Sequence, residues 1–310
     1  MLPIFLQTLP FFALIGCGWL ASLRGVFPAD AAAILTRFVF YFALSAMLFR
    51  LAATLPVEQI WNPEFLLAYL AATAVLYILV LAAGLLRKEA VAVAAFEAQT
   101  ATIGNVGFLG LPMFVALYGQ AAALPVLMGL VVDLVVFGSL IVMVVEAGRG
   151  GGGLRTVATA LLGLARNPMI LSVVAGLAWS ASGWALPGPI DDFLTILGAA
   201  ATPCALFAIG CSLAQQSADR RRSAAVGLSF VKLVLHPLAV AAAMLLVFDV
   251  DPFLAAIAIA SAGMPVAGNV FILAQHYGIA AQRVSAAILI STVLSVLSVT
   301  IVLALVSPQA

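Results

Sequence analysis

Charge is what this sequence has least of. Of its 310 residues only 13 are Lys or Arg and 12 are Asp or Glu, so that 8% of the chain is charged while 65% is hydrophobic. A water-soluble domain of this length needs many more polar residues to cover its surface. A soluble enzyme is therefore excluded, and the net charge of +1 gives no field that favours nucleic acid as a partner.

Cysteine and histidine are also scarce. The three cysteines, Cys17, Cys204 and Cys211, are an odd number inside apolar segments, and their spacing fits neither a disulfide framework nor a zinc site. The two histidines do not form the HExxH pattern of zinc enzymes, and the chain has no GxSxG nucleophile motif. These absences predict a protein without a metal, a cofactor or covalent catalysis, and they argue against an intramembrane enzyme.

What the chain has instead is a succession of apolar stretches, each about long enough to cross some 30 Å of hydrocarbon as a helix. Ten stretches can be distinguished, at residues 2–23, 31–54, 64–86, 91–118, 121–145, 168–184, 190–214, 224–248, 251–277 and 281–306. Helices satisfy their own backbone amides in lipid, and the short alternating strands of a barrel are missing from the sequence. The predicted fold class is an all-α integral membrane protein with ten transmembrane helices.

The positive residues fall on one side of this predicted topology. The connections after the odd-numbered helices carry Lys and Arg, whereas the even connections and both termini carry none. The residues concerned are Arg24, Arg87, Lys88, Arg149, Arg155, Arg166, Arg220, Arg221, Arg222 and Arg283. By the positive-inside rule the odd connections are cytoplasmic and both termini lie outside. This pattern predicts a multi-pass protein of the cell membrane, which in a bacterium is the inner membrane.

A weak internal repeat relates the two halves of the chain. Trp19 recurs as Trp179 and Gly104 as Gly263, among other pairs that keep the same order in each half. Each half holds five predicted helices, an odd number, so the second half must insert upside down relative to the first. Inverted repeats of this kind are typical of secondary transporters.

A glycine run at 150–153 marks the boundary between the halves. It lacks the Gly-Lys-Ser/Thr that follows in a phosphate-binding loop, so a flexible cytoplasmic linker is predicted, with a short surface helix at 154–165. The predicted division is a first five-helix repeat at 1–145, the linker at 146–167, and a second, inverted repeat at 168–310.

The fourth and ninth predicted helices carry helix-breaking residues at mid-span, at equivalent places of the repeat. Proline removes an amide donor, and glycine tolerates the unwound backbone that results. Unwound backbone at this depth must line protein or a water-filled cavity, where each following half-helix presents free N–H groups and its positive dipole end. A binding site for a carboxylate is therefore predicted, the alternative being packing glycines and a proline kink. Its residues are Asn105, Gly104, Gly107, Pro112, Pro265, Gly268 and Asn269.

Four ionisable residues inside the predicted spans are candidates for proton or ion coupling: Glu97, Asp133, Lys232 and His236. A charge at this depth costs at least about 2.5 kcal/mol on insertion scales, so it usually faces a cavity or a partner. Asp133 is the deepest, and a role in proton coupling or substrate polarity is predicted for it. Glu97 is an alternative partner for Lys232, which otherwise extends toward the cytoplasmic face. His236 is equally a core histidine or a proton relay.

The segments around these breaks resemble the motifs of the auxin efflux carrier family, which includes plant PIN auxin exporters and bacterial carriers of malonate and related acids. The resemblance is carried by 104–112 (GNVGFLGLP), by 232–237 (KLVLHP) and by 264–278 in the ninth helix. Ser45 departs from it, because many relatives have proline at that place.

The resemblance implies a fold shared with bile-acid and sodium–proton carriers, in which helices 4 and 9 cross at their breaks. It also implies a scaffold of helices 1, 2, 6 and 7, a mobile core of helices 3–5 and 8–10, a homodimer, and a substrate carboxylate held near Asn105.

The function predicted from all these features is a secondary transporter that moves small organic carboxylate anions across the membrane by alternating access. Either a proton or sodium serves as the coupling ion. The alternatives are a sodium-coupled symporter of larger anions such as bile acids, and a membrane-embedded sensor or enzyme that does not transport.

Overall fold

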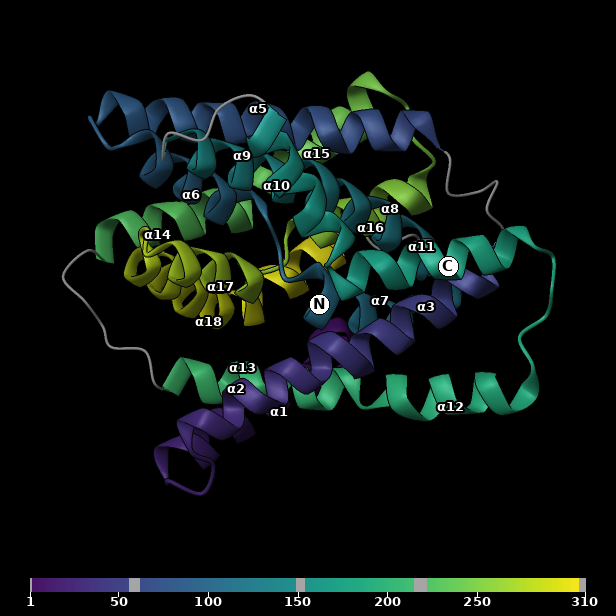
Figure 1. The fold of residues 1–310 in the computed structure, drawn as a ribbon. Helices are drawn as coiled ribbons and strands as arrows, with labels where there is room; N and C mark the ends of the chain where they lie inside the picture. Colours follow the sequence, from purple (N-terminus) through teal and green to yellow (C-terminus); the bar gives the residue numbers. More distant parts are fainter. Residues whose placement is uncertain (1, 56–61, 149–153, 215–221, 307–310) are drawn as a thin grey trace.

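The computed structural model describes residues 2–55, 62–148, 154–214 and 222–306, and the elements named in these ranges are all helices (Figure 1). Within these described ranges, seven helical stretches are long and apolar enough to cross a membrane: Phe5–Leu23, Asp30–Thr54, Pro63–Leu86, Gln120–Gly148, Gly188–Ala214, Ser223–Val247 and Ala281–Val306. Three shorter apolar helices are Val106–Tyr118, Pro168–Ala181 and Pro252–Ala262. The prediction of an all-helical membrane protein is confirmed.

The helices of the first half follow the predicted apolar stretches closely. They are α1 (Leu2–Leu23), α2 (Ala29–Phe38), η1 (Val39–Ala43), α3 (Leu44–Thr54), α5 (Pro63–Leu86), α6 (Val91–Thr102), η2 (Val106–Gly110), α7 (Leu111–Tyr118), η3 (Gln120–Ala122), α8 (Ala123–Val131), η4 (Val132–Phe137) and α9 (Gly138–Gly148). The elements η1, η2 and η4 are π-helical turns that continue directly into α-helix.

The second half begins after a short helix, α10 (Leu154–Ala165), which has the bounds predicted for the linker helix. The glycine run at 150–153 lies outside the described residues. The remaining helices are α11 (Pro168–Ala181), α12 (Gly188–Ala199), α13 (Ala201–Ala214), α14 (Arg222–Phe230), η5 (Val231–Leu235), α15 (His236–Ala242), η6 (Ala243–Val247), α16 (Pro252–Ala262), α17 (Gly268–Tyr277) and α18 (Ala281–Val306). Of these, η5 and η6 are π-helical turns.

The helices pack in two groups. In the first, which we call the scaffold group, α1 and α2 pack on α13, and α3 packs on α11 and α12. In the second, the core group, α5 packs on α6 and α15, α14 and α17 pack on α18, α16 packs on α8, α15 and α18, and η4 packs on α8. Figure 1 shows α1, α2, α3, α12 and α13 along one side of the molecule, with α5, α6, α14 and α15 along the other. The grouping agrees with the partition of helices that the family resemblance implies.

Close approach within the scaffold group depends on glycine. A Cβ atom at Gly18 of α1 would collide with the backbone of Phe207 on α13, and one at Gly210 of α13 would collide with the backbone of Ile15 on α1. Small residues at such interfaces let helix backbones approach closely in lipid, where van der Waals contact replaces the hydrophobic effect as the driving force.

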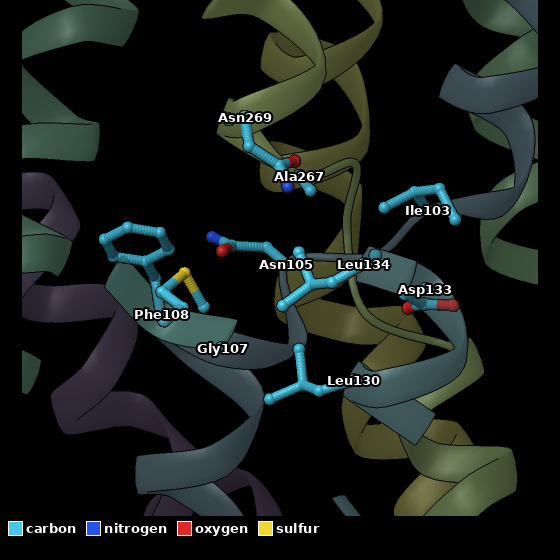
Figure 2. A pocket seen from close by; sticks show the side chains of 12 residues that line it. Ile103, Asn105, Gly107, Phe108, Leu130, Asp133, Leu134, Ala267 and Asn269 are labelled. Atoms are coloured by element: carbon cyan, nitrogen blue, oxygen red, sulfur yellow. The ribbon is translucent and has the colours of Figure 1, made fainter. Parts of the chain in front are cut away.

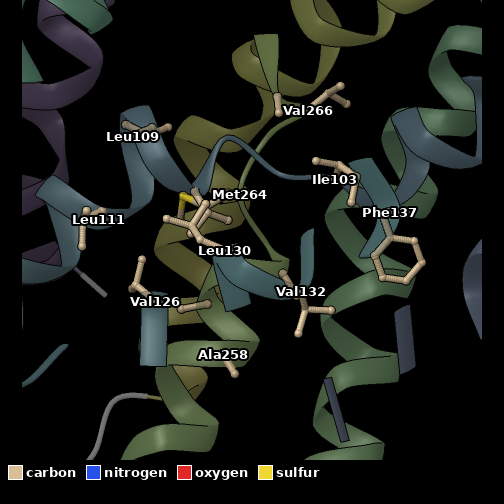
Figure 3. Packing of buried hydrophobic residues seen from close by; sticks show 14 of the residues in the cluster. Ile103, Leu109, Leu111, Val126, Leu130, Val132, Phe137, Ala258, Met264 and Val266 are labelled. Atoms are coloured by element: carbon tan, nitrogen blue, oxygen red, sulfur yellow. The ribbon is translucent and has the colours of Figure 1, made fainter. Parts of the chain in front are cut away.

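The helix interruptions expected in 91–118 and 251–277 are both present, and they pair with each other. The helix stops after Thr102 and resumes at Val106, while α16 ends at Ala262 and α17 starts at Gly268. Between them Gly104 and Val266 form an isolated antiparallel bridge. We call the paired segments 103–105 and 263–267 the crossover. Figure 3 shows them passing one another among buried apolar side chains.

Two backbone hydrogen bonds hold the crossover together. The amide of Asn105 donates to the Pro265 carbonyl oxygen at 2.7 Å, and the amide of Ala267 donates to the Ile103 carbonyl oxygen at 3.1 Å. Backbone groups freed by unwinding are thus satisfied by protein, as they must be where no water can reach them. The side chains around them, including Ile103 and Val266, are almost completely buried.

Candidate functional site

A cavity lies at the crossover (Figure 2). The residues that line it are Ile103, Gly104, Asn105, Gly107, Phe108, Leu130, Asp133, Leu134, Met169, Ala267, Gly268 and Asn269. Most of them belong to the core group or to the crossover, and Met169 is on α11 of the scaffold group. Gly107 and Phe108 are on η2, which contacts both α8 of the core group and α13 of the scaffold group. The cavity therefore lies at the boundary between the two groups of helices. Its volume is about 20 Å³, which is room for about one water molecule.

Asn105 offers the cavity an amide that the described part of the chain leaves uncommitted. Its backbone is fixed on both sides, because its N–H bonds Pro265 and its carbonyl oxygen accepts from Leu109 and Gly110. Its side chain is 6% exposed and makes no hydrogen bond within the described residues. A rigid backbone with a free side-chain amide is a prepared donor for a bound ligand.

Asn269 contributes a second amide from the opposite broken helix. Its side-chain oxygen is buried and has no hydrogen-bond partner among the described residues. Figure 2 shows the side chain of Asn269 above the same cavity into which Asn105 points. A buried polar atom without a partner costs roughly 1–3 kcal/mol, so a ligand or water that bonds it gains that amount back.

The starts of both half-helices face this cavity as well. Asn105 is the residue that precedes the helical turn at Val106, and Ala267 precedes α17. The first N–H groups of a helix have no partner within it, and they carry the positive end of the helix dipole. Gly107, Gly268 and Asn269, which line the cavity, are among these first residues. The cavity is therefore suited to an anion.

Asp133 is on the π-helical turn η4 and is 3% exposed. One carboxylate oxygen accepts a hydrogen bond from the Tyr69 hydroxyl at 3.4 Å, and the other has no partner among the described residues. Asp133 lines the cavity, but Figure 2 shows its carboxylate and the Asn105 side-chain amide on opposite sides of the crossover. The negative charge is thus set behind the position at which an anion would bind.

Lys232 and His236 lie together next to the crossover, and both are completely buried. The Lys232 ammonium contacts His236 Nδ1 at 3.0 Å and the carbonyl oxygen of Ala262 at 2.5 Å, while His236 Nε2 contacts the Thr73 hydroxyl at 3.1 Å. The sequence expectation that Lys232 extends to the cytoplasmic face is wrong. Its side chain turns inward because the carbonyl at the end of α16 provides an acceptor there.

Glu97 belongs to a different cluster. Its carboxylate is 1% exposed and forms ion pairs with Arg87 and Arg283, and Arg283 also pairs with Glu89 at 3.0 Å. Glu97 is therefore not the partner of Lys232. Arg283, which the sequence suggested only as a connection residue, is a buried residue of α18 that ties the second half of the chain to the first.

The two prolines predicted for the site do not line the cavity. Pro265 contributes its carbonyl oxygen to the crossover. Pro112 lies in the first turn of α7, directly after the π-helical turn η2, where its missing N–H is tolerated. The apolar lining residues, such as Phe108 and Met169, were not predicted from the sequence. No residue pattern distinguishes them from other core side chains in so apolar a chain.

Comparison with known proteins gives this geometry its context. The chain matches the family described as "Membrane transport protein" over residues 3–151 and 154–303. It is 35% identical to a protein of Rhizobium meliloti (strain 1021) named "Putative malonate transporter", over 94% of this chain and 92% of the relative. It is 25% identical to "Auxin efflux carrier component 5" of Arabidopsis thaliana, over 87% of each chain.

The family match extends over nearly the whole chain, and it agrees with the resemblance drawn from the motifs at 104–112, 232–237 and 264–278. The apolar helices supply the membrane-spanning segments that such a protein needs. The chain belongs to the auxin efflux carrier family of membrane transport proteins, and it is a transporter rather than an enzyme.

Proposed function

We propose that this protein is a secondary transporter that moves small organic carboxylate anions across the membrane by alternating access. It binds these anions at the crossover. The observation that carries the proposal is a single cavity that is lined both by the uncommitted side-chain amide of Asn105 and by the first residues of two half-helices, whose N–H groups have no partner within the helix. The proposed substrate site comprises Asn105, Gly104, Gly107, Gly268 and Asn269, with Pro112 and Pro265 shaping the backbone around it.

A short dicarboxylate is the substrate class that fits best. The R. meliloti relative is named for malonate, and it matches almost the full length of this chain. Two half-helix starts face one cavity, and each is suited to one carboxylate. The cavity has a volume of about 20 Å³, room for about one water molecule, so the site must widen before any substrate enters.

Widening follows naturally from where the cavity lies. Met169 of the scaffold group closes a cavity whose other walls come from the core group, η2 and the crossover. A movement of the core group along the scaffold group would uncover the site on one side of the membrane and then on the other. This is the alternating access that broken helices at a repeat interface serve in transporters.

We further propose the architecture that this movement needs. Ten membrane spans form two inverted five-helix repeats, 1–145 and 168–310, joined by the cytoplasmic linker 146–167. Both termini are on the outer side, and two copies of the chain associate in the membrane, as the family resemblance implies. The charge pattern of the connections supports the orientation.

Proton coupling at Asp133 completes the proposal. A charged Asp133 beside the site opposes a second negative charge, so binding of the anion is favoured when Asp133 carries a proton. Sodium is the alternative coupling ion. Of the other coupling candidates, Glu97 is held by two arginines, and Lys232 and His236 are hydrogen-bonded to each other, so none of them is as free as Asp133 to exchange a proton.

The test is uptake by purified protein in proteoliposomes. Radiolabelled malonate, malate, lactate and indole-acetate are offered with and without an inward proton gradient. We expect saturable uptake of malonate or malate, faster with the proton gradient, and slower uptake of the two monocarboxylates. Equal and non-saturable entry of all four compounds in vesicles with and without the protein would refute the proposal.

A further inference from the structure

Lys232 has a contact set that the proposed substrate site does not use. It is completely buried and does not line the cavity at the crossover. A buried ammonium without partners is very costly, so a lysine at this depth needs compensating oxygen or nitrogen acceptors. The groups that the Lys232 ammonium contacts therefore indicate the role of its charge.

The first acceptor is the end of a broken helix. Ala262 is the last residue of α16, and its carbonyl oxygen accepts from the Lys232 ammonium at 2.5 Å. The last carbonyl groups of a helix have no partner within it, and they carry the negative end of the helix dipole. The amides of Gly263 and Met264 already bond the carbonyl oxygens of Ile259, Ala260 and Ser261. The ammonium therefore satisfies the last carbonyl group of α16, that of Ala262, at the point where the ninth helix breaks.

The ammonium also touches the other broken helix. A Cβ atom at Gly104 would lie 3.0 Å from Lys232 Nζ and 3.2 Å from the carbonyl oxygen of Ser261. Lys232 thus fills the space between Gly104 of one broken helix and the end of α16 of the other. Glycine at position 104 is what allows the ammonium to reach that place.

A third contact orients the side chain. Lys232 donates to His236 Nδ1, which leaves His236 Nε2 to donate to the hydroxyl of Thr73 on α5. Asp133 interacts electrostatically with Lys232 and supplies a nearby negative charge. The ammonium thus has three compensating partners: the Ala262 carbonyl oxygen, the His236 imidazole and the charge of the Asp133 carboxylate.

In carriers with broken helices, unwound carbonyl groups and half-helix C-terminal ends coordinate Na⁺, and the Lys232 ammonium bonds a group of this kind, the last carbonyl of α16. We propose that Lys232 is a tethered cation that occupies this position permanently, so that the crossover is assembled without sodium and the protein transports without it. The part of this inference that concerns transport rests on the proposed function. The part that concerns the crossover does not.

The experiment is thermal unfolding of the purified protein in detergent, in chloride salts of sodium, choline and methylammonium at equal ionic strength. The unchanged protein should have the same Tm in all three salts. The variant Lys232→Ala should melt lower in choline and should gain about 2–4 °C in a saturable way from methylammonium or sodium, which can enter the vacated place.

Leu233→Ala is the matched control, because Leu233 is a buried neighbour on the same π-helical turn. It should melt lower through lost packing and should show no preference among the three salts. A purely structural role of Lys232 would give Lys232→Ala the same behaviour as Leu233→Ala, and that result would overturn the proposal. A Tm of the unchanged protein that rises with sodium over choline would also overturn it.

If Lys232→Ala cannot be purified in a folded state, the unchanged protein decides the question through its Tm in sodium and in choline. Malonate uptake into proteoliposomes is the second readout, and it should proceed at the same rate in sodium and in choline at equal pH. Since thermal unfolding requires no transported substrate, a protein that carries no malonate refutes the proposed function, while the cation response still decides this inference.

Discussion

At the scale of single residues, the buried polar side chains fall into two kinds. Glu97 and Lys232 have their partners within the fold, whereas the amides of Asn105 and Asn269 leave donors or acceptors open toward the cavity. The sequence identified these four residues as candidates, but it could not tell which of them have partners within the fold and which are open toward the cavity. The pairing of Glu97 with Arg283 joins residues 186 positions apart, and no local spacing encodes that contact.

The first prediction concerns the proton at Asp133. The groups that face its carboxylate are the Tyr69 hydroxyl and the charge of Lys232, with His236 behind them. Asp133→Asn keeps the shape of the side chain and imitates its protonated form. We expect this variant to exchange malonate across proteoliposomes but to lose the acceleration that a lower outside pH gives to the unchanged protein.

Tyr69→Phe is the control, because it removes the hydrogen bond and leaves the carboxylate able to take up a proton. It should keep the pH response. If uptake by Asp133→Asn still accelerates as the outside pH falls, the coupling proton is carried elsewhere.

At the scale of helices, composition predicted where the breaks lie, because Gly and Pro gather at mid-span in both 91–118 and 251–277. It could not predict that the unwound segments pair through Gly104 and Val266, since this bridge joins two halves of the chain. The π-helical turns were equally hidden. They rotate the helix locally, and both Asp133 and Lys232 lie on such turns.

The contact between α1 and α13 gives a second prediction. A Cβ atom at Gly18 would collide with backbone atoms of Phe207, which cannot move aside as a side chain can. Gly18→Ala should therefore lower stability by about 1–3 kcal/mol, seen as a lower Tm of the purified protein. Gly16→Ala on the same helix meets nothing within 4 Å and should leave Tm unchanged or slightly raised. Equal effects of the two substitutions would contradict this account of the interface.

The ion pairs at the start of α18 give a third prediction. Arg283→Ala leaves the buried Glu97 carboxylate with Arg87 alone, whose side chain is 54% exposed. Removing one partner of a buried pair typically costs about 3–5 kcal/mol, so the Tm of the variant should fall clearly. Adding Glu97→Gln to Arg283→Ala should recover part of the loss, because no uncompensated charge then remains. A double variant that is less stable than Arg283→Ala would contradict this explanation.

At the scale of the whole molecule, the division into a scaffold group and a core group places the cavity where relative movement would open it. The sequence predicted ten spans, whereas in the part of the chain that the structure describes seven helical stretches are long enough to cross a membrane by themselves. Two of the three shorter apolar helices, Val106–Tyr118 and Pro252–Ala262, are halves of the broken helices. A break at mid-span shortens the continuous helix without shortening the segment, so length alone cannot decide the number of spans.

Orientation in the membrane gives a fourth prediction. The native cysteines are first replaced by serine, and single cysteines are then introduced at Pro189, Asp249 or Lys88. The positive-inside pattern places the first two outside and the third in the cytoplasm. An impermeant thiol reagent applied to intact cells should therefore label the variants at 189 and 249 but not the variant at 88. Labelling at 88 from outside would reverse the proposed orientation.

The central claim is that a small organic anion binds at the crossover through Asn105, and calorimetric titration of malonate into the purified protein tests it most directly. A hydrogen bond to a charged group is worth about 1.5–3 kcal/mol, so Asn105→Ala should weaken binding roughly ten- to a hundredfold. Asn105→Asp should be weaker still at neutral pH, because it sets a negative charge beside the anion. Gln275→Ala, which removes an exposed amide outside the cavity, should bind as the unchanged protein does. If Asn105→Asp binds malonate as tightly as the unchanged protein, the anion is not held at the crossover.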